Sequence, residues 1–166
     1  MSAAGELRQL MLREPRLKLA LAESMTGGHL QTRVTAVSGA SDYFVGGITA
    51  YTLDEKVQHL GVNHSAAALV NSVSATVAEQ MAIGACVLFD ADVALATTGY
   101  AEPSVEWMVT QPFAWWAAAR RKSAKEGFSL RSGRIECPGA TRVEAQAAVA
   151  DAALAALVGW LQQVRT

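Results

Sequence analysis

Short apolar runs alternate along the chain with apolar residues at helical spacing. The runs at residues 17–22, 44–51 and 92–100 have the length of buried strands. Two later runs, residues 113–121 and 127–139, are strand candidates that a short turn would join as a hairpin. The pattern therefore predicts three strands separated by helices, followed by a β-hairpin.

Five segments carry the helical spacing: residues 5–14, the stretch from 28 onward, 53–61, 71–91 and 141–165. Ser74 is placed to cap the fourth of these helices. The apolar stripe of that helix is expected to contain Val77, Met81, Ala85 and Leu88. At the start of the last helix, Thr141 and Glu144 have the spacing of a capping box.

Helices that alternate with short buried strands are typical of a layered α/β domain. We expect a three-layer α/β/α domain with a mixed, mostly parallel sheet, because the late hairpin adds antiparallel pairing. The 166 residues contain no internal repeat, low-complexity tract or linker, so residues 1–166 are predicted to form a single domain.

Composition narrows the classes of function. With 17% charged residues and a formal net charge of −1, the chain has no general electrostatic attraction to nucleic acid or acidic membranes. Cys86, Cys137 and the three histidines follow no metal-ligand spacing, and no uninterrupted apolar run reaches bilayer-spanning length. We therefore expect a cytoplasmic protein with buried free thiols. It should act on a small molecule without a metal or cofactor and bind neither nucleic acid nor membranes.

Polar residues and glycines follow each of the first three apolar runs. They are Glu23, Ser24, Thr26, Gly27 and Gly28 after the first run, Tyr51 and Thr52 after the second, and Thr97, Thr98 and Gly99 after the third. Ligands of open α/β sheets bind beyond the carboxyl ends of the strands, so these residues are expected to meet at one cleft. The backbone N–H groups of Gly27 and Gly28, at a helix start, would face an anion or a developing oxyanion.

Ser24 allows two interpretations. It is either a capping residue at an ordinary strand-to-helix turn or a nucleophile held at the end of a strand. A serine nucleophile needs a base, and Lys56 is the best candidate because a partly desolvated lysine loses its proton more readily. The Tyr51 hydroxyl would relay that proton. Because serine, tyrosine and lysine are common residues, spacing alone favours the structural interpretation.

Several stretches of the chain resemble a known protein family. "AESMTGG" (22–28), followed by "SGASDYFVGGITAYTLDEKVQHLGV" (38–62), is similar to the C-terminal domain of the competence-damage-inducible CinA family, which includes nicotinamide mononucleotide deamidases. "NSVSATVAEQMAIGA" (71–85) and "FDADVALATTGYAEP" (89–103) are similar to the family's next two blocks. The resemblance covers residues 5 to about 103.

The resemblance implies a concrete reaction, the metal-independent hydrolysis of the nicotinamide mononucleotide carboxamide to nicotinic acid mononucleotide and ammonia. By position, Ser24 would be the nucleophile, with Tyr51 and Lys56 activating it. Thr98 would lie at the substrate pocket. The turn from Thr26 to Gly28 would help to hold the oxyanion or the phosphate.

After Gly99 the chain departs from the deamidase pattern. Tyr100 and Glu102 stand where that pattern has small residues, and Trp107 stands where it has a glycine-rich loop. Bulky side chains would block the close approach of backbone to a phosphate. Glu102 would add a negative charge near an anionic ligand.

The arginines that the deamidases carry before the last helix are also displaced. Thr141 and Ala145 occupy the matching positions, and Arg142 is out of register. Three functions therefore stay open: a deamidase of nicotinamide mononucleotide, a hydrolase of another small amide or ester, and a non-catalytic paralogue that binds a nucleotide or a partner protein. The alanine-rich last helix suits a subunit interface, so we expect a homo-oligomer.

Overall fold

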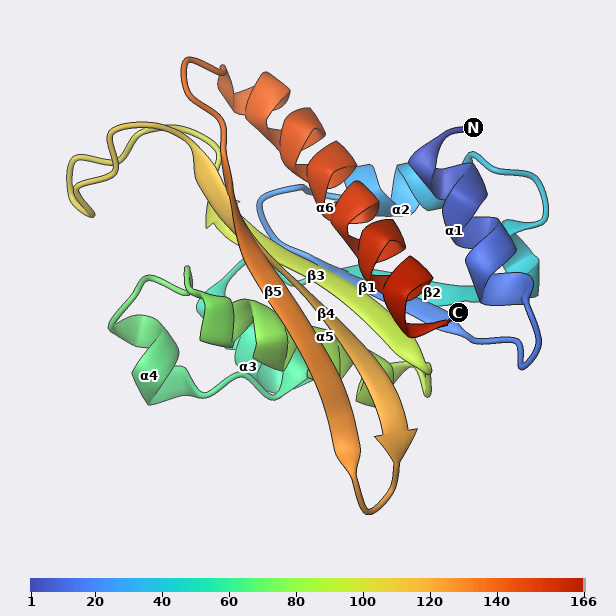
Figure 1. The fold of residues 1–166 in the computed structure, drawn as a ribbon. Helices are drawn as coiled ribbons and strands as arrows, with labels where there is room; N and C mark the ends of the chain where they lie inside the picture. The colour runs from blue at the N-terminus through green and yellow to red at the C-terminus, as the bar shows by residue number, and fades with distance from the viewer. Residues whose placement is uncertain (166) are drawn as a thin grey trace.

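The computed structural model describes residues 1–165, and its main helices and strands follow the predicted order, with two short additional helices at residues 40–42 and 64–68 (Figure 1). In chain order they are α1 (Ala3–Leu12), β1 (Leu19–Glu23), α2 (His29–Thr35), the 3-10 helix η1 (Ala40–Asp42), β2 (Phe44–Thr49), α3 (Leu53–Leu60), α4 (His64–Ala68), α5 (Ala75–Leu88), β3 (Val93–Tyr100), β4 (Phe113–Ser123), β5 (Gly127–Glu136) and α6 (Arg142–Val164).

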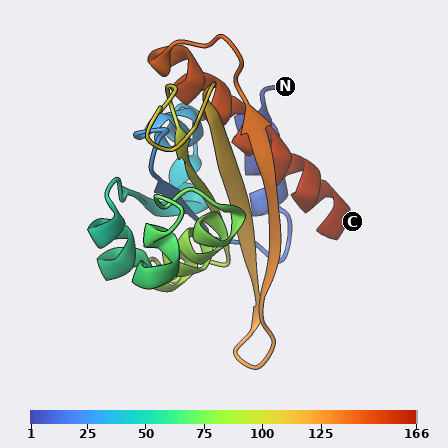
Figure 2. The ribbon, with the colours of Figure 1, turned by 90° about the vertical axis from the view of Figure 1, so that its left-hand side faces the viewer.

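The five strands form one mixed sheet in the order β2-β1-β3-β4-β5. Strand β1 pairs in parallel with β2 and β3, whereas β4 is antiparallel to both β3 and β5. Four strands therefore share one direction and only β4 runs against them. The predicted hairpin is confirmed, and its tip projects beyond the helices in both ribbon views (Figures 1 and 2).

Helices cover both faces of the sheet, which confirms the three-layer α/β/α architecture (Figures 1 and 2). Leu21 and Leu95 point to the face covered by α1, α2 and α6, while Ala22 and Ala96 point to the face covered by α3 and α5. This alternation follows from the two-residue period of a strand. The small alanine side chains leave α5 room to lie close to the sheet.

Close packing continues between α3 and α5. A Cβ atom added to Gly84 in α5 would lie 2.1 Å from the carbonyl oxygen of Leu60 at the end of α3. The absence of a side chain at this glycine thus lets α3, which carries Lys56, pack directly against α5.

The predicted helix caps are confirmed. The Ser74 side chain accepts a hydrogen bond from the N–H of Val77 at 3.1 Å, and Thr141 and Glu144 form the capping box of α6. The predicted place of Leu88 in the buried stripe of α5 is wrong, because its exposed fraction is 46%. Buried positions in α5 recur in pairs every four residues and end at 85–86, so Leu88 lies off that stripe.

Helix α6 is the one helix, among residues 1–165, that is long and apolar enough to cross a membrane by length and composition. Its residues Leu154, Leu157 and Leu161 are buried in the main core. The core helix of a globular protein has the same composition, so this property is weak evidence for a membrane segment.

Candidate active site

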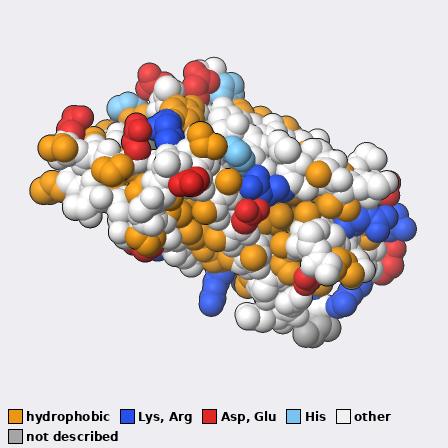
Figure 3. Space-filling view, turned by 90° about the horizontal axis from the view of Figure 1, so that it is seen from above, with side chains coloured by type: hydrophobic (Ala, Val, Ile, Leu, Met, Phe, Trp, Pro, Cys, Tyr) orange, Lys and Arg blue, Asp and Glu red, His pale blue; other side chains and the backbone are white. Residues whose placement is uncertain are grey.

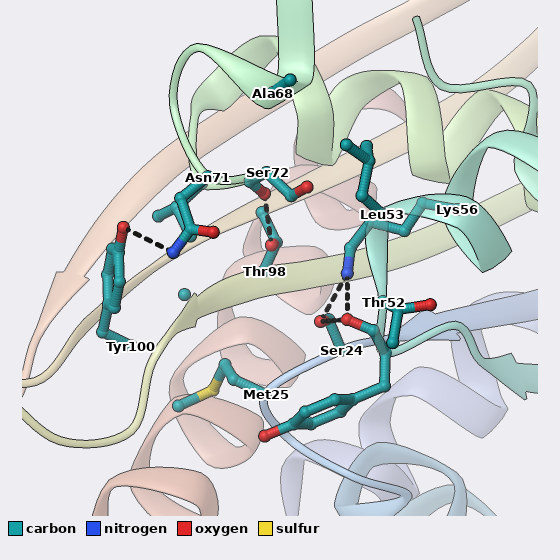
Figure 4. A pocket seen from close by; sticks show the side chains of 13 residues that line it. Ser24, Met25, Thr52, Leu53, Lys56, Ala68, Asn71, Ser72, Thr98 and Tyr100 are labelled. Atoms are coloured by element: carbon teal, nitrogen blue, oxygen red, sulfur yellow. Dashed lines mark hydrogen bonds between the residues drawn. The ribbon is translucent and has the colours of Figure 1, made fainter. Parts of the chain in front are cut away.

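The carboxyl ends of β1, β2 and β3 lie side by side at one edge of the sheet. Glu23 at the end of β1 pairs with Thr49 at the end of β2, and the Ser24 N–H donates to the carbonyl of Thr97 in β3 at 3.1 Å. Ser24 follows β1 directly and lines a cavity of about 440 Å³ at this edge. The cavity also receives residues from the β2–α3 and α4–α5 connections (Figure 4).

Ser24 and Lys56 meet at the floor of this cavity (Figure 4). Lys56 Nζ donates to Ser24 Oγ at 2.8 Å and to the backbone carbonyl of Tyr51 at 2.7 Å. The exposed fractions of Ser24 and Lys56 are 6% and 1%. The first turn of α3 begins at the Thr52 cap, and it turns the Lys56 side chain inward, away from the solvent-facing side of that helix.

Burial lowers the pKa of Lys56 to about 8. The cause is desolvation, which disfavours the charged form of an amine. A usable fraction of Lys56 is therefore neutral near neutral pH. Neutral Lys56 keeps one N–H on the Tyr51 carbonyl, because a carbonyl oxygen can only accept, and its lone pair is then free to take the proton of Ser24.

The structure brings the backbone of Tyr51, rather than its phenol, to Lys56. Its carbonyl accepts from Lys56 Nζ and lies 3.4 Å from Ser24 Oγ. Its side chain is half exposed, and the phenol oxygen accepts a hydrogen bond from Arg142 Nη2 at 2.7 Å. The phenol relay expected from the sequence has no corresponding contact to Ser24 or Lys56 within residues 1–165.

Glu23 organises the turn that carries Ser24. Its fully buried carboxylate accepts from the N–H of Leu30 (2.8 Å), the N–H of Gln31 (3.1 Å), the Gln31 side chain (3.0 Å) and the Thr26 hydroxyl (2.7 Å). These donors occupy both carboxylate oxygens. Glu23 thus ties the end of β1 to the start of α2 and does not face the cavity.

The other expected binding residues divide into two groups. Gly27 and Gly28 adopt positive φ values of 56° and 103° and form the turn into α2, but like the buried Thr26 they do not line the cavity. Thr98 and Gly99 do line it. Of the predicted binding residues discussed here, Thr98 and Gly99 at the end of β3 therefore line the cavity. Gly27 and Gly28 instead form the turn that leads from Ser24 into α2.

The opposite wall of the cavity comes from residues that the sequence did not indicate. Asn71 and Ser72, in the connection from α4 to α5, adopt positive φ values of 48° and 60°. The Ser72 carbonyl accepts from the Thr98 hydroxyl at 2.7 Å, and Asn71 Nδ2 donates to the Tyr100 hydroxyl at 3.2 Å (Figure 4). An Asn-Ser pair suits a left-handed turn, which is the one local signal that could have placed this wall.

Arg142, the first residue of α6, reaches the rim of the cavity although its register differs from the family pattern. Its Nη1 donates to Glu102 Oε1 at 2.9 Å, and its Nη2 bonds Tyr51. Both side chains of the ion pair are partly exposed. The loop that follows β3 is therefore joined to α6 and to the β2–α3 connection through one guanidinium.

Cys86 and Cys137 are buried free thiols, as predicted. Within residues 1–165, no group of three or more His, Cys, Asp or Glu side chains is arranged to hold a metal ion. Among the residues described here, Ser24 and Lys56 are the hydroxyl and the buried amine that are hydrogen-bonded to each other at the cavity.

The family model of the CinA C-terminal domain matches residues 3–161 of this chain. The chain belongs to this family. The match extends well beyond residue 103, so the divergent loop, the hairpin and most of α6 lie within the CinA domain itself.

Curated relatives carry CinA-like names. A CinA-like protein of Chlorobium limicola is 37% identical over 154 residues, covering 93% of this chain and 36% of the relative. A CinA-like protein of Picosynechococcus sp. is 50% identical over 93 residues, covering 56% of this chain and 22% of the relative. The chain thus spans about a fifth to a third of the length of these relatives.

Solved structures share the fold over nearly the whole chain. The competence/damage-inducible protein CihA of Agrobacterium tumefaciens has a TM-score of 0.82 at 28% identity, covering 97% of this chain and 96% of the other. The competence damage-inducible protein A of Klebsiella pneumoniae has a TM-score of 0.84 at 26% identity, covering 96% and 95%. The CinA domain of this chain therefore has the architecture of its family.

Proposed function

We propose that this CinA domain is an amide hydrolase of the nicotinamide mononucleotide deamidase type, which converts a pyridine carboxamide into the carboxylate and ammonia. The observation that carries the proposal is the 2.8 Å hydrogen bond between Lys56 Nζ and Ser24 Oγ on the wall of an accessible cavity. A capping serine needs no buried lysine beside it. A serine nucleophile does need a base of lowered pKa within hydrogen-bond reach.

The proposed reaction has two halves. Neutral Lys56 takes the proton of Ser24 as Oγ attacks the amide carbon, and the proton then passes to the amide nitrogen as the C–N bond breaks and ammonia leaves. A water molecule next attacks the acyl-serine ester and gives its proton to Lys56, which returns it to Ser24. The carboxylic acid that forms gives its proton to ammonia or solvent water and leaves as the carboxylate, and the pair is restored.

The test is ammonia release from nicotinamide mononucleotide by the purified protein. We expect release with wild type, none above background with Ser24→Ala, and wild-type rates with the exposed control Ser38→Ala. An activated acyl or phosphonate probe should label wild type and not Ser24→Ala. Equal turnover by Ser24→Ala would refute the nucleophile assignment.

A non-catalytic role is the second candidate, and one observation favours it. Arg142 is already engaged by Glu102 and Tyr51 rather than free for a ligand. Under this alternative, neither nicotinamide mononucleotide nor nicotinamide riboside is turned over and no probe labels Ser24, whether or not either ligand raises the melting temperature. Turnover that depends on Ser24 would exclude it.

A further inference from the structure

A second cavity adjoins the one that contains Ser24. Its volume is about 460 Å³, and it lies between the end of β3, the loop that follows it and the start of α6. Asn71, Gly99 and Tyr100 line both cavities, so the two share a wall. A substrate bound with its carbonyl carbon at Ser24, and long enough to pass these shared residues, would place its remaining atoms in the second space.

The charges around the second cavity do not suit a phosphate. Glu102 and Glu106 line it together with Arg142, which is the one Lys or Arg side chain in its lining. The Arg142 guanidinium already bonds Glu102 and Tyr51. Lys56, in the adjoining first cavity, is directed to Ser24.

Figure 3 is seen from above. Acidic and hydrophobic side chains lie next to one another at its left-hand end, the side on which the loop after β3 lies in Figure 1. Trp107 also lines the second cavity. Its ring offers a face to a flat or cationic group. The second cavity therefore combines negative charge with an aromatic surface.

We propose that Glu102 is a specificity-determining residue. By pairing with Arg142, it makes this arginine less available to bind a phosphate, so the site prefers amides with an uncharged or cationic tail. The proposal rests on the proposed function and refines it: pyridine nucleosides and similar amides that lack a phosphate are accepted in preference to the mononucleotide. A phosphate that approaches Arg142 would lie beside the Glu102 carboxylate, which already pairs with the Arg142 guanidinium and would repel the second anion. Such a repulsive element discriminates between ligands as effectively as an attractive one.

The ion pair is partly exposed, which limits the size of the effect. Interactions between solvent-exposed charges are weak and screened by salt, so we expect a preference of about 5- to 10-fold rather than an absolute exclusion. The preference should shrink as ionic strength rises.

The experiment compares two ligands that differ only in the phosphate, nicotinamide riboside and nicotinamide mononucleotide. We expect the wild-type ratio of kcat/KM to favour the riboside about 5- to 10-fold at low salt. Glu102→Gln should shift this ratio at least about 5-fold toward the mononucleotide, since Arg142 is then free for the phosphate. Glu126→Gln, the same charge change at the hairpin turn, should leave the ratio at its wild-type value.

Removing the arginine as well sharpens the result. In the variant Glu102→Gln/Arg142→Gln, the gain for the mononucleotide should disappear, because the Arg142 guanidinium that would bind the phosphate has been removed. A wild-type preference for the mononucleotide, or a ratio that Glu102→Gln does not change, would overturn the proposal.

Binding separates this proposal from the hydrolytic one. The same ligands and inorganic phosphate are titrated calorimetrically into Ser24→Ala and Ser24→Ala/Glu102→Gln, after circular dichroism has shown that both are folded. Two results together support the specificity assignment, even if no variant hydrolyses the amide. The riboside binds more tightly than the mononucleotide, and inorganic phosphate binds to Ser24→Ala/Glu102→Gln but not to Ser24→Ala. Equal affinities, or binding of neither ligand, would overturn it.

Discussion

The two neighbouring cavities differ in how their polar side chains are held. Around Ser24, the charged groups Glu23 and Lys56 are fully or almost fully buried, and their hydrogen bonds run to backbone and side chains of the same interior. Around Glu102, the charged groups are partly exposed and hold one another through a surface ion pair. A buried group that loses its partners costs several times more than an exposed one, so the two regions tolerate change very differently.

This difference suggests a division of roles. The interior arrangement fixes the geometry of the reactive pair. The rim, made of exposed side chains on a loop and a helix start, can change without loss of the fold. Under the proposed function, substitutions at the rim would alter which substrate tail is accepted while the reactive pair stays unchanged. The following predictions test this division, from the largest expected effect to the smallest.

Lys56→Met should give the largest loss of activity. Removing the base leaves Ser24 unactivated, so kcat/KM for amide hydrolysis is expected to fall by about a thousandfold or more. The free energy of unfolding at pH 7 should stay the same or rise, because an apolar side chain replaces a buried amine for which residues 1–165 supply no carboxylate partner. Steady-state kinetics and urea denaturation measure the two effects.

The exposed Lys125→Met in the hairpin turn is the matched control for Lys56→Met, and it should change neither quantity. Full activity in Lys56→Met would show that this lysine is structural.

Glu23→Ala should destabilise the fold more than any change at the rim. It leaves four donors from Thr26, Leu30 and Gln31 without their acceptor, and the free energy of unfolding should fall by about 3 kcal/mol. Glu102→Ala, which removes an exposed carboxylate, should cost less than about 1 kcal/mol. Denaturation of both variants side by side measures the contrast, and equal losses would contradict the division between interior and rim.

The rate of amide hydrolysis should rise with pH through about 8, the lowered pKa of Lys56. Only the neutral amine accepts a proton, so kcat/KM should increase about tenfold between pH 7 and pH 9 and then level off. A profile that is flat over this range would exclude Lys56 as the base.

The free energy of unfolding should also rise with pH as Lys56 loses its proton. Its folded pKa of about 8 lies below its ordinary value of 10.5, so the native state binds fewer protons than the unfolded state between these values. The free energy of unfolding therefore rises with pH from about 8, and the full cost of the buried charge is present below that pH. Above pH 9 the buried Cys86 thiol, whose pKa burial raises to about 12, opposes the trend. The clear window is pH 8 to 9, and Lys56→Met should abolish the rise there.

Trp107→Ala should have the smallest effect on stability. Trp107 is 37% exposed on the loop, so its removal should cost less than about 1 kcal/mol. If its ring contacts the tail of the substrate, KM should increase a few-fold while kcat changes little. A fall in kcat with unchanged KM would instead place Trp107 at the reacting atoms.

Much of this fold could be predicted from local pattern, because strand runs, caps and turns are determined over a few residues. The Ser74 cap, the Thr141–Glu144 capping box and the β4–β5 hairpin are of this kind. Helix α4 is only five residues long, too short to show a period. The spacing of apolar residues wrongly predicts Leu88 in the buried stripe of α5, because spacing alone does not distinguish that stripe from the exposed end of the helix.

The site was harder to predict because its contacts are long-range. The sequence indicated Ser24 and Lys56, but the direction of a carbonyl or a phenol depends on the backbone after folding, and the sequence assigned to the Tyr51 phenol a contact that its carbonyl makes. Arg142 reaches Tyr51 across 91 positions. No local pattern connects such residues, so the pairing of Arg142 with Glu102 emerged only from the structure.

The carbonyl of residue 51 has a consequence for mutagenesis. Every amino acid possesses that oxygen, so an alanine scan would score the position as dispensable for orienting the amine, and the assay would miss a genuine participant. Exchanging the peptide linkage that follows residue 51 for an ester, which weakens the acceptor without touching any side chain, would expose the role that genetic substitution conceals.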